Sequence, residues 1–509
     1  MILMCNIFSF LQDSTRLYPD KVYVIDKENE FTYLEVYNKA TALARLLYDL
    51  GVRSGDRILV YLDNSAEYIA AYFGILLLNA IIVPINKNIS VESIHYIIGD
   101  TSPRCIITNG VFIQRLQGKF DFEESNMIDI DRMRQDEPAH KPDLTWKLTE
   151  DGDRPALILY TSGTTSMPKG VTLTHKNLIA NTESIVEYLG LTQKDSLLAV
   201  INFSYSYGNS LMLTHTKAGS KIIIENRVSY PIKVIEQLYT SKVSGFSTVG
   251  SYINILLKQE GLKDFHLENL RYITFAGEST SFDDIAKLKD IAPHLKIFVM
   301  YGQTEASARL SYLEPDLIFK KVGSIGKGIP GVTLRVITEN GMEVPAGEIG
   351  EIIASGDNIM KGYWNNEADT KSVVKDGWLY TGDLAVTDEE GYIYVKGRKD
   401  DIIKYLGHRI SPVEIEAAIN SCEYVLESAV IGIENSNGKQ IKAVVVLTNS
   451  KAGIEDINVH VRKLLPAFKR PHIIEFVNEL PRTATGKIKR SELRKVNNQE
   501  ISEVDFLKT

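Results

Sequence analysis

The sequence predicts an α/β protein with a large N-terminal domain of stacked, mostly parallel α/β subdomains, a small β subdomain and a small α+β C-terminal domain. Short apolar strands alternate with helical periodicity between residues 31 and 300, which predicts parallel sheets covered by helices. From about residue 322 the pattern changes to short β segments between Gly and Asp turns. From Asp401 the order β, α, β, β, α, β predicts a further domain. We place the domains at residues 1–399 and 400–509.

The first helices begin at residues with capping side chains. Thr32 is expected to cap a helix that ends near Gly51, because the apolar residues between them recur at helical spacing. Asn64 or Ser65 is expected to cap the next helix, and Ser90 another. The strands expected between these helices are residues 58–62, 80–85 and 105–107.

The alternation continues through the middle of the chain. Helices are expected at residues 176–188 and 232–239, and strands at 197–201, 221–224, 272–275 and 296–300. The last two strands run into loops rich in Gly, Ser, Thr and Glu, and open α/β sheets bind ligands in such loops. The β subdomain is expected to contain strands 333–337, 350–354 and 392–395.

The C-terminal domain is expected to contain two helices. Ser411 is expected to cap the first, which runs through Ile419, and Ile454 or Asp456 to begin the second, which runs to Leu465. Strands are expected at residues 442–447 and 473–477.

Composition narrows the class of protein. The 509-residue chain is 44% hydrophobic and 24% charged, as globular proteins are, and its net charge of −8 argues against a nucleic-acid surface. Cys5, Cys105 and Cys422 have no paired spacing, which argues against a disulfide framework or a zinc cluster. The apolar run at residues 68–85 contains Asn79 and Pro84, so it favours a buried helix and strand over a membrane span. Without a signal-peptide pattern, a soluble cytoplasmic protein is expected.

The loop TSGTTSMPKG at residues 161–170 concentrates hydroxyls, glycines and one lysine between two β-like runs. Glycine lets backbone N–H groups turn toward an anion and lysine supplies charge, so the loop predicts a polyphosphate cradle, with a solvent loop as the alternative. The G-x-G-x-x-G run at 326–331 leads through Pro330 into a β pattern, not into the helix of a dinucleotide site. No G-x-x-x-x-G-K-[ST] sequence occurs, which disfavours P-loop kinases.

Four further stretches contain groups suited to a nucleotide. YGQTE at 301–305 combines an aromatic ring, a hydroxyl and a carboxylate able to bind Mg²⁺, although a plain helix start would also explain it. WLYTGD at 378–383 ends in Asp383, either a ribose acceptor or a turn aspartate. The charged stretches at 397–412 and 481–490 could each be solvated surface.

In this order, the five stretches resemble the signature of the adenylate-forming superfamily: acyl-CoA synthetases, stand-alone adenylation enzymes and firefly-luciferase-like proteins. The matching elements are TSGTT-x-x-PKG, YG-x-TE, TGD, GR-x-D and P-x-T-x-x-GK. The resemblance implies an AMP-forming acid–thiol ligase that uses ATP and Mg²⁺. A carboxylate would attack the α-phosphate to release pyrophosphate, and a thiol, foremost that of CoA, would then take the acyl group. The implied alternative loads an acyl or amino acid onto the phosphopantetheine of an acyl carrier protein.

The resemblance also implies a role for each matching residue. Lys169 would stabilise the leaving pyrophosphate, Thr304 would contact the α-phosphate and Glu305 would bind Mg²⁺. Lys487 would bridge the carboxylate and the α-phosphate. Tyr301 and the segment 277–279 would enclose the adenine, and Asp383 and Arg398 would bind the ribose. The implied nucleotide contacts are Thr161, Ser162, Gly163, Thr164, Thr165, Gly277, Glu278, Ser279, Tyr301, Gly302, Asp383 and Arg398.

A hinge between the two half-reactions is implied at Asp400. A few residues that absorb a large φ/ψ change suffice for such a rotation, so the prediction concerns the backbone of Asp400. In the rotated state, Gly407 and Arg409 would replace Lys487 at the active site and line the thiol channel.

Two departures from the family pattern bear on rate and substrate. Ser166 stands where the family usually has glycine, and slower adenylation is the most that we expect. Ser204 aligns with the aspartate that pairs with the α-ammonium group in amino-acid-activating relatives, which disfavours α-amino acids because a buried ammonium needs a partner. The Gly277–Glu278 pair nevertheless resembles those relatives. The acid pocket is implied at Tyr205, Gly208, Thr248 and Ala276, without deciding between a chain and a ring acid.

Overall fold

A computed structural model describes residues 5–116, 126–133, 148–161, 167–259, 267–277, 281–405, 408–435, 438–448, 453–482 and 488–495. Two compact units are present. The first contains Met1–Arg335, Ile353–Thr381 and Glu390–Ile393, and the second contains Val336–Ile352, Gly382–Glu389 and Tyr394–Thr509.

The first unit contains a seven-stranded sheet in the order β18-β8-β7-β4-β3-β5-β6. Strands β3 to β7 pair in parallel, whereas β7 with β8 and β8 with β18 are antiparallel. Every residue of β4 and β5 is buried, as expected for parallel strands covered on both faces. The bounds are β3 (Arg57–Val60), β4 (Ile81–Pro84), β5 (Cys105–Thr108), β6 (Met127–Asp129), β7 (Pro155–Thr161), β8 (Lys169–Thr174) and β18 (Gly362–Tyr363).

The same unit contains a nine-stranded sheet in the order β15-β14-β13-β12-β11-β9-β10-β1-β2. Its six central strands are parallel, and the outer strands β2, β14 and β15 pair antiparallel. The bounds are β1 (Val22–Asp26), β2 (Asn29–Thr32), β9 (Ser196–Ala199), β10 (Lys221–Ile224), β11 (Gly245–Thr248), β12 (Tyr272–Phe275), β13 (Lys296–Tyr301), β14 (Ser311–Leu313) and β15 (Lys327–Gly328).

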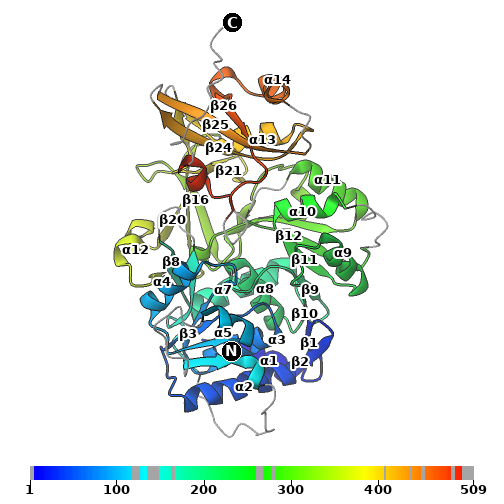
Figure 1. The fold of residues 1–509 in the computed structure, drawn as a ribbon, viewed down its shortest axis with the longest axis vertical. Coiled ribbons are helices and arrows are strands. Elements are labelled where there is room, and N and C mark those ends of the chain that lie inside the picture. Colours follow the sequence, from blue (N-terminus) through cyan, green and yellow to red (C-terminus); the bar gives the residue numbers. More distant parts are fainter. Residues whose placement is uncertain are drawn as a thin grey trace. The chain divides into compact units, whose positions relative to one another are not determined.

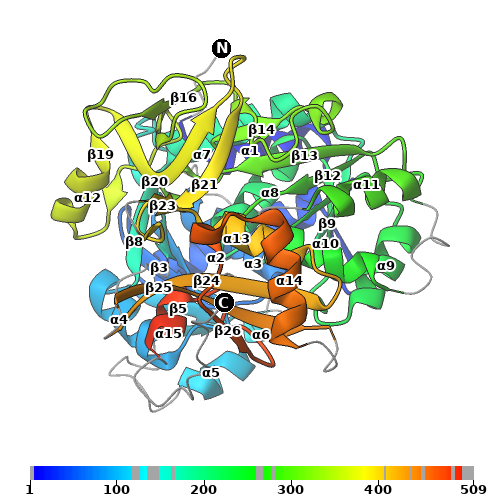
Figure 2. The ribbon, with the colours of Figure 1, turned by 90° about the horizontal axis from the view of Figure 1, so that it is seen from above.

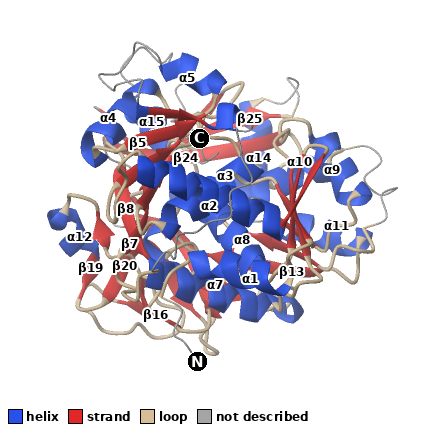
Figure 3. Cartoon of the chain, turned by 90° about the horizontal axis from the view of Figure 1, so that it is seen from below, coloured by secondary structure: helices blue, strands red, loops and turns tan. Residues whose placement is uncertain are grey.

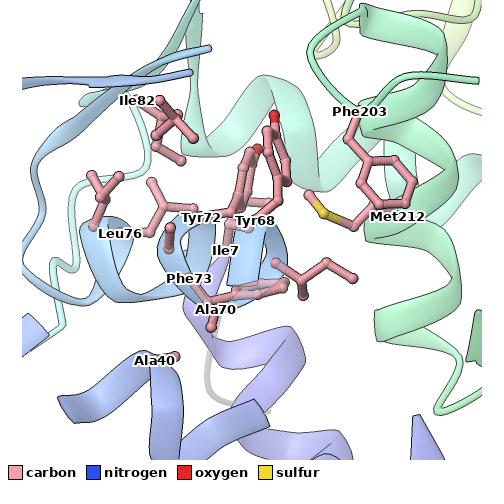
Figure 4. Close-up of a cluster of buried hydrophobic side chains, with 14 of the residues drawn as sticks. Ile7, Ala40, Tyr68, Ala70, Tyr72, Phe73, Leu76, Ile82, Phe203 and Met212 are labelled. Atoms are coloured by element: carbon pink, nitrogen blue, oxygen red, sulfur yellow. The ribbon is translucent and has the colours of Figure 1, made fainter. Parts of the chain in front are cut away.

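Helices lie between these two sheets and join them through one hydrophobic core (Figures 1 and 3). They are α1 (Phe8–Leu17), α2 (Tyr33–Asp49), α3 (Ala66–Leu77), α7 (His175–Leu189) and α8 (Ser206–Lys217). Figure 4 shows the centre of this core, where Tyr68 of α3 lies 5.8 Å, centroid to centroid, from the ring of Phe203. The core draws apolar side chains from both sheets, so it fixes the loops at their strand ends relative to one another.

The remaining helices of the first unit are α4 (Val91–Thr101), α5 (Gly110–Leu116), α6 (Ile130–Met133), α9 (Pro231–Thr240), α10 (Gly250–Leu257), α11 (Phe282–Ile291) and α12 (Glu367–Val373). Two short 3₁₀ helices are η3 (Thr304–Ala306) and η4 (Pro315–Leu317). A five-stranded sheet has the order β16-β17-β20-β19, with β21 paired to β20. Its strands are β16 (Val332–Ile337), β17 (Gly350–Gly356), β19 (Val374–Lys375), β20 (Trp378–Thr387) and β21 (Ile393–Arg398).

The C-terminal part of the second unit has its own core around a three-stranded sheet, β24-β25-β26. Figure 2 shows α13 and α14 beside β24 and β25. The bounds are β22 (Ile403–Tyr405), β23 (His408–Ile410), α13 (Pro412–Asn420), β24 (Val425–Asn435), β25 (Gly438–Leu447), α14 (Ile454–Leu464), η5 (Ala467–Lys469), β26 (Ile473–Phe476) and α15 (Arg490–Lys495).

Most predicted helix starts are confirmed, and one cap is wrong. The side chains of Thr32, Ser65 and Ser90 each accept a hydrogen bond from the backbone N–H three residues on. Ser411 occupies the N-cap position of α13, but its hydroxyl donates to the carbonyl of Lys396 instead of capping the helix. Pro412 follows at the first helical position, where proline needs no capping partner for an N–H.

The predicted α/β fold class is confirmed. Strands 221–224 and 272–275 have the predicted bounds, and the Pro330 segment leads into strand β16 and not into a helix. Every residue of α3 is buried, as expected for the apolar run at residues 68–85. Within the described ranges, no helix is long and apolar enough to cross a membrane.

Candidate active site

The predicted phosphate loop connects two paired strands. β7 ends at Thr161 and β8 begins at Lys169, and these two residues are register partners in the antiparallel pair. The Thr161 hydroxyl lies 3.5 Å from the Lys169 carbonyl. Ser162, Gly163, Thr164, Thr165 and Ser166 lie outside the described residues. The hairpin therefore fixes both ends of the loop, including its lysine.

Lys169 has an acidic and an aromatic neighbour. Its Nζ lies 2.7 Å from Oδ2 of Asp369 and 5.1 Å from the centroid of the Tyr363 ring. Asp369 belongs to α12, where Asn366 hydrogen-bonds both its backbone N–H and its carboxylate. The ammonium of Lys169 holds the pKa of the Asp369 carboxyl below its usual range. Both side chains line a polar groove of about 210 Å³, together with Tyr96, Asp100, residues 167–170 and residues 363–366.

Glu305 shares the Tyr363 side chain with Lys169. The Tyr363 hydroxyl donates to Oε1 of Glu305 at 2.9 Å, while its ring faces Lys169. The backbone of Glu305 is also fixed, because its carbonyl accepts from the Met360 N–H at 2.8 Å. The predicted metal carboxylate and the predicted phosphate lysine thus lie on either side of one tyrosine.

Thr304 begins the 3₁₀ helix η3, which starts after Gly302 and Gln303, the two residues that follow β13. Its hydroxyl lies 3.2 Å from that of Ser206, the first residue of α8. Gln303, and not Thr304, occupies the N-cap position, so the plain capping interpretation of this threonine is wrong. The Thr304 hydroxyl therefore does not cap the helix and contacts the Ser206 hydroxyl instead.

The predicted adenine contacts follow the ends of β12 and β13. Tyr301 is the last residue of β13 and is half-buried against a small apolar cluster. A Cβ on Gly302 would lie 1.8 Å from the Ala308 carbonyl oxygen, so the backbone turn requires glycine. Gly277 has φ +89°, a left-handed conformation that favours glycine. Glu278 and Ser279 lie outside the described residues.

The predicted ribose pair is assembled within the second unit. Nε of Arg398, the last residue of β21, lies 2.9 Å from Oδ1 of Asp383 in β20. Glu351 supports the pair, because it accepts from the Gly382 N–H and pairs with Lys399. The two residues therefore form one local structure.

The remaining predicted residues of the second unit are only partly described. Asp400 is exposed in the turn after β21. Arg409 is paired through its backbone with Lys404 in the β22–β23 hairpin. Gly407, Lys487 and the side chain of Arg409 lie outside the described residues. The roles predicted for them stay predictions.

Two of the four predicted pocket residues lie at neighbouring strand ends of the first unit, and the other two lie at the start of helix α8. Thr248 ends β11, Ala276 follows β12, and the Ala276 N–H donates to the Thr248 carbonyl at 3.4 Å. Tyr205 and Gly208 flank the start of α8, and burial raises the pKa of the Tyr205 hydroxyl. A Cβ on Gly208 would lie 2.1 Å from the Asn202 carbonyl oxygen. Packing therefore requires this glycine, and its presence is no sign of room for a chain.

Sequence reasoning missed Tyr363, Asp369 and Tyr207. Tyr363 and Asp369 occur in KGYWNNEAD, an unremarkable run whose only signal is two aromatic residues before an acidic helix start. The Tyr207 hydroxyl hydrogen-bonds to Thr274 in β12, which places the tyrosine under the predicted acid pocket. The sequence signal for Tyr207 is that it lies close to Ser204 and Tyr205, which were already assigned to the acid pocket region.

Comparison with known proteins agrees with this geometry. The pattern of the AMP-binding enzyme family matches residues 11–364, and that of the AMP-binding enzyme C-terminal domain matches residues 414–487. The chain belongs to the AMP-binding enzyme family. This confirms the superfamily resemblance seen in the five sequence stretches.

Members of this family match the chain over nearly its whole length. A 2-succinylbenzoate–CoA ligase of Bacillus cytotoxicus is 29% identical, over 96% of this chain and 98% of the relative. A long-chain-fatty-acid–CoA ligase of Bacillus subtilis is 30% identical, over 95% of this chain and 93% of the relative. The solved O-succinylbenzoate CoA synthetase of Bacillus subtilis, in complex with ATP and magnesium, is 26% identical with a TM-score of 0.84, covering 95% and 98% of the two chains.

These matches establish the class of reaction. The chain is an AMP-forming acid–CoA ligase family enzyme. A carboxylic acid is the substrate class of this activity. The reaction predicted from the sequence is confirmed at this level.

Proposed function

We propose that this chain joins a carboxylic acid to ATP through Lys169, Thr304, Glu305 and Lys487, and then passes the acyl group to CoA. The observation that supports these roles most strongly is the double contact of Tyr363. Its ring lies 5.1 Å from the Lys169 ammonium, and its hydroxyl lies 2.9 Å from the Glu305 carboxylate. A cation for phosphates and a carboxylate for a metal are thereby held at a fixed spacing before any ligand binds.

The residues present fit Mg²⁺ bound together with a nucleotide. Tyr363 donates to Oε1 of Glu305, and the carboxylate is a hard oxygen ligand of the kind that Mg²⁺ prefers. Among the described residues, no cluster of three or more His, Cys, Asp or Glu side chains could hold a metal alone. This favours a Mg²⁺ that is held by Glu305, by water and by the phosphates of the bound nucleotide. When bound, Mg²⁺ would neutralise phosphate charge.

Each of these side chains would then stabilise or position one part of the reacting groups. Attack of the acid carboxylate on the α-phosphate concentrates negative charge there, and the Thr304 hydroxyl, supported by Ser206, would donate to it. Lys169 would stabilise the departing pyrophosphate. Lys487 would align the carboxylate, and Asp383 with Arg398 would fix the ribose. Positioning, not proton transfer, supplies most of the rate.

The second half-reaction is assigned to a rotated C-terminal domain. The proposed boundary is 399/400, with Asp400 as the hinge and Gly407 and Arg409 lining the path of the thiol. The exposed position of Asp400 in a turn supports this, because such a residue can change φ and ψ without breaking core packing. A cytoplasmic location is part of the proposal and is supported by the scarcity of cysteine, three in 509 residues with no paired spacing.

An acyl carrier protein is the alternative acceptor, because its phosphopantetheine arm presents the same thiol as CoA. An α-amino acid as its cargo is disfavoured. Ser204, at the position where amino-acid-activating relatives have aspartate, is buried, and its hydroxyl lacks a hydrogen-bond partner among the described residues. It offers no charge to an ammonium group.

The test measures products and acceptors separately. Purified protein with ATP, Mg²⁺ and an acid should form AMP and pyrophosphate, whereas formation of ADP would overturn the proposal. Adding CoA or a phosphopantetheinylated carrier protein then identifies the acceptor by thioester formation. Glu305→Gln should lower the rate and raise the Mg²⁺ requirement. Glu183→Gln, which removes only an exposed ion pair with Lys217, serves as a folding control.

A further inference from the structure

Arg309 is a buried arginine in the turn between β13 and β14, and only 2% of its surface is exposed. Its backbone is held from two sides, because its carbonyl accepts hydrogen bonds from Asn181 and Asn358. Among the described residues, no carboxylate forms an ion pair with its guanidinium. Arginine stays charged in proteins, so this site contains a buried positive charge without a counter-ion.

The neighbours of the guanidinium are soft and uncharged. Its Nε donates to the thioether sulfur of Met300 at 3.1 Å, and its Cζ lies 4.0 Å from the centroid of the Tyr207 ring. The Tyr188 hydroxyl donates to the same Met300 sulfur at 3.1 Å. A thioether is a weak acceptor, and one cation–π contact offsets only part of the cost of burying a charge.

The position of Arg309 is next to the proposed acid pocket. Tyr207, which stacks on the guanidinium, hydrogen-bonds to Thr274 at the inner part of β12. Ser206, which precedes Tyr207 in the chain, has its hydroxyl 3.2 Å from the hydroxyl of Thr304. Met300 is the penultimate residue of β13, so the charge lies among the C-terminal ends of parallel strands, where such sheets bind ligands.

We propose that Arg309 pairs with a second anionic group of the acid substrate, at the end remote from the reacting carboxylate. The proposal rests on the function proposed above and narrows its substrate class to acids with two anionic groups. A second carboxylate matches the planar guanidinium best, because the two can form parallel hydrogen bonds. A sulfonate or phosphate shares the same chemistry and is a separate arm of the test.

The alternative is that Arg309 only supports the packing of Tyr207, Tyr188 and Met300. The two explanations differ in what Arg309→Met does to stability. Methionine has a similar length and no charge, so removal of an unpaired buried charge should leave Tm equal or higher. A packing role instead predicts a lower Tm together with an equal loss of activity toward every acid.

The experiment compares pairs of acids that differ by a second anionic group at the remote end: glutarate with valerate, terephthalate with benzoate, and 4-sulfobenzoate with benzoate. Acid-dependent ATP–pyrophosphate exchange gives kcat/KM for each acid. For at least one pair, the wild-type enzyme should prefer the dianionic acid by about tenfold or more, the size expected for a charged hydrogen bond. Arg309→Met should abolish that preference, because kcat/KM should fall for the dianionic acid alone while KM for ATP stays unchanged. Arg309→Lys should retain part of the preference.

Arg271→Met is the matched control. Arg271 lies on the same sheet but pairs with Asp195 at 2.9 Å, so its loss should lower Tm without changing the preference among acids. A wild-type preference for the monoanionic acids, or an equal loss of both acids in Arg309→Met, would overturn the role of Arg309. No exchange with any acid would instead overturn the proposed function itself.

Discussion

The Nζ of Lys169 lies 2.7 Å from Oδ2 of Asp369, so the lysine proposed for phosphate binding is already paired with a carboxylate. The pair is partly exposed, with 29% of the lysine side chain and 38% of the aspartate side chain accessible. Solvent screening makes such a pair weak, so a polyphosphate can displace the carboxylate. Asp369 thereby keeps the lysine oriented between turnovers.

Asp369→Asn should tighten ATP binding, because the phosphates no longer compete with a carboxylate for Lys169. KM for ATP in the exchange assay should fall by up to about fivefold, the range of an exposed ion pair. Asp357→Asn is the matched control, since Asp357 pairs with the exposed Lys176 at 2.9 Å on helix α7. A higher KM for ATP in Asp369→Asn would show that the pair assists phosphate binding and does not oppose it.

Tyr363→Phe should weaken the use of Mg²⁺ while leaving the aromatic contact to Lys169. The variant loses only the hydroxyl that donates to Glu305, a hydrogen bond to a charged group. The Mg²⁺ concentration for half-maximal exchange should rise about tenfold. Tyr394→Phe removes a similar contact, to Asp388, in the second unit and should leave the Mg²⁺ titration unchanged. Identical titrations for the wild type and Tyr363→Phe would refute the link between Tyr363 and the metal.

Lys487→Ala should separate the two half-reactions. Without the lysine the carboxylate and the α-phosphate repel each other, so exchange should be lost. Transfer of the acyl group from supplied acyl-adenylate to CoA should continue, because that step is assigned to Gly407 and Arg409 and not to Lys487. Rapid-quench measurement of both steps tests this, and equal loss of both would remove Lys487 from its assigned role.

Acid should destabilise the first unit through two buried histidines. Burial lowers the pKa of His175 and of His215 to about 4 in each case, against an ordinary value of 6.5. Between these pKa values each histidine is protonated in the unfolded chain but neutral in the folded chain. The free energy of unfolding therefore falls as pH falls from about 6.5 to 4, by up to about 3 kcal/mol for each histidine. Tm should therefore drop between pH 7 and pH 5.

His215→Gln provides the control for that pH dependence. His215 bonds through Nδ1 to the Leu211 carbonyl and through Nε2 to the Tyr272 hydroxyl, so the variant is expected to be less stable at pH 7. Its Tm should nevertheless depend less on pH than that of the wild type. An unchanged slope of Tm against pH would show that other groups dominate acid unfolding.

Local signals in the sequence were sufficient to predict many of the helices and strands of the fold. Thr32 and Ser65 cap helices because a hydroxyl at that position meets a free N–H whatever the tertiary context. Strand β12 has the predicted bounds and β13 extends one residue past the predicted 296–300, to Tyr301, since short apolar runs followed by glycine and polar residues mark strand ends. Ser411 failed as a cap because a distant carbonyl, that of Lys396, competes for its hydroxyl.

The contacts that decide chemistry were not visible in the sequence, because they join distant segments. Tyr363 and Glu305 are 58 residues apart, and each is an ordinary residue of its own segment. Arg309 is followed by a leucine and a serine in an unremarkable turn, and only the fold shows that its charge is buried. Burial and pairing across strands depend on tertiary packing, which local propensity does not specify.

Acid-dependent ATP–pyrophosphate exchange by the full-length protein tests the central claim most directly. With Mg²⁺ and a panel of mono- and dianionic carboxylic acids, labelled pyrophosphate should enter ATP only when an accepted acid is present, and Lys169→Ala should slow this markedly. Exchange that is independent of acid, or absent with every acid across the panel, would contradict the account.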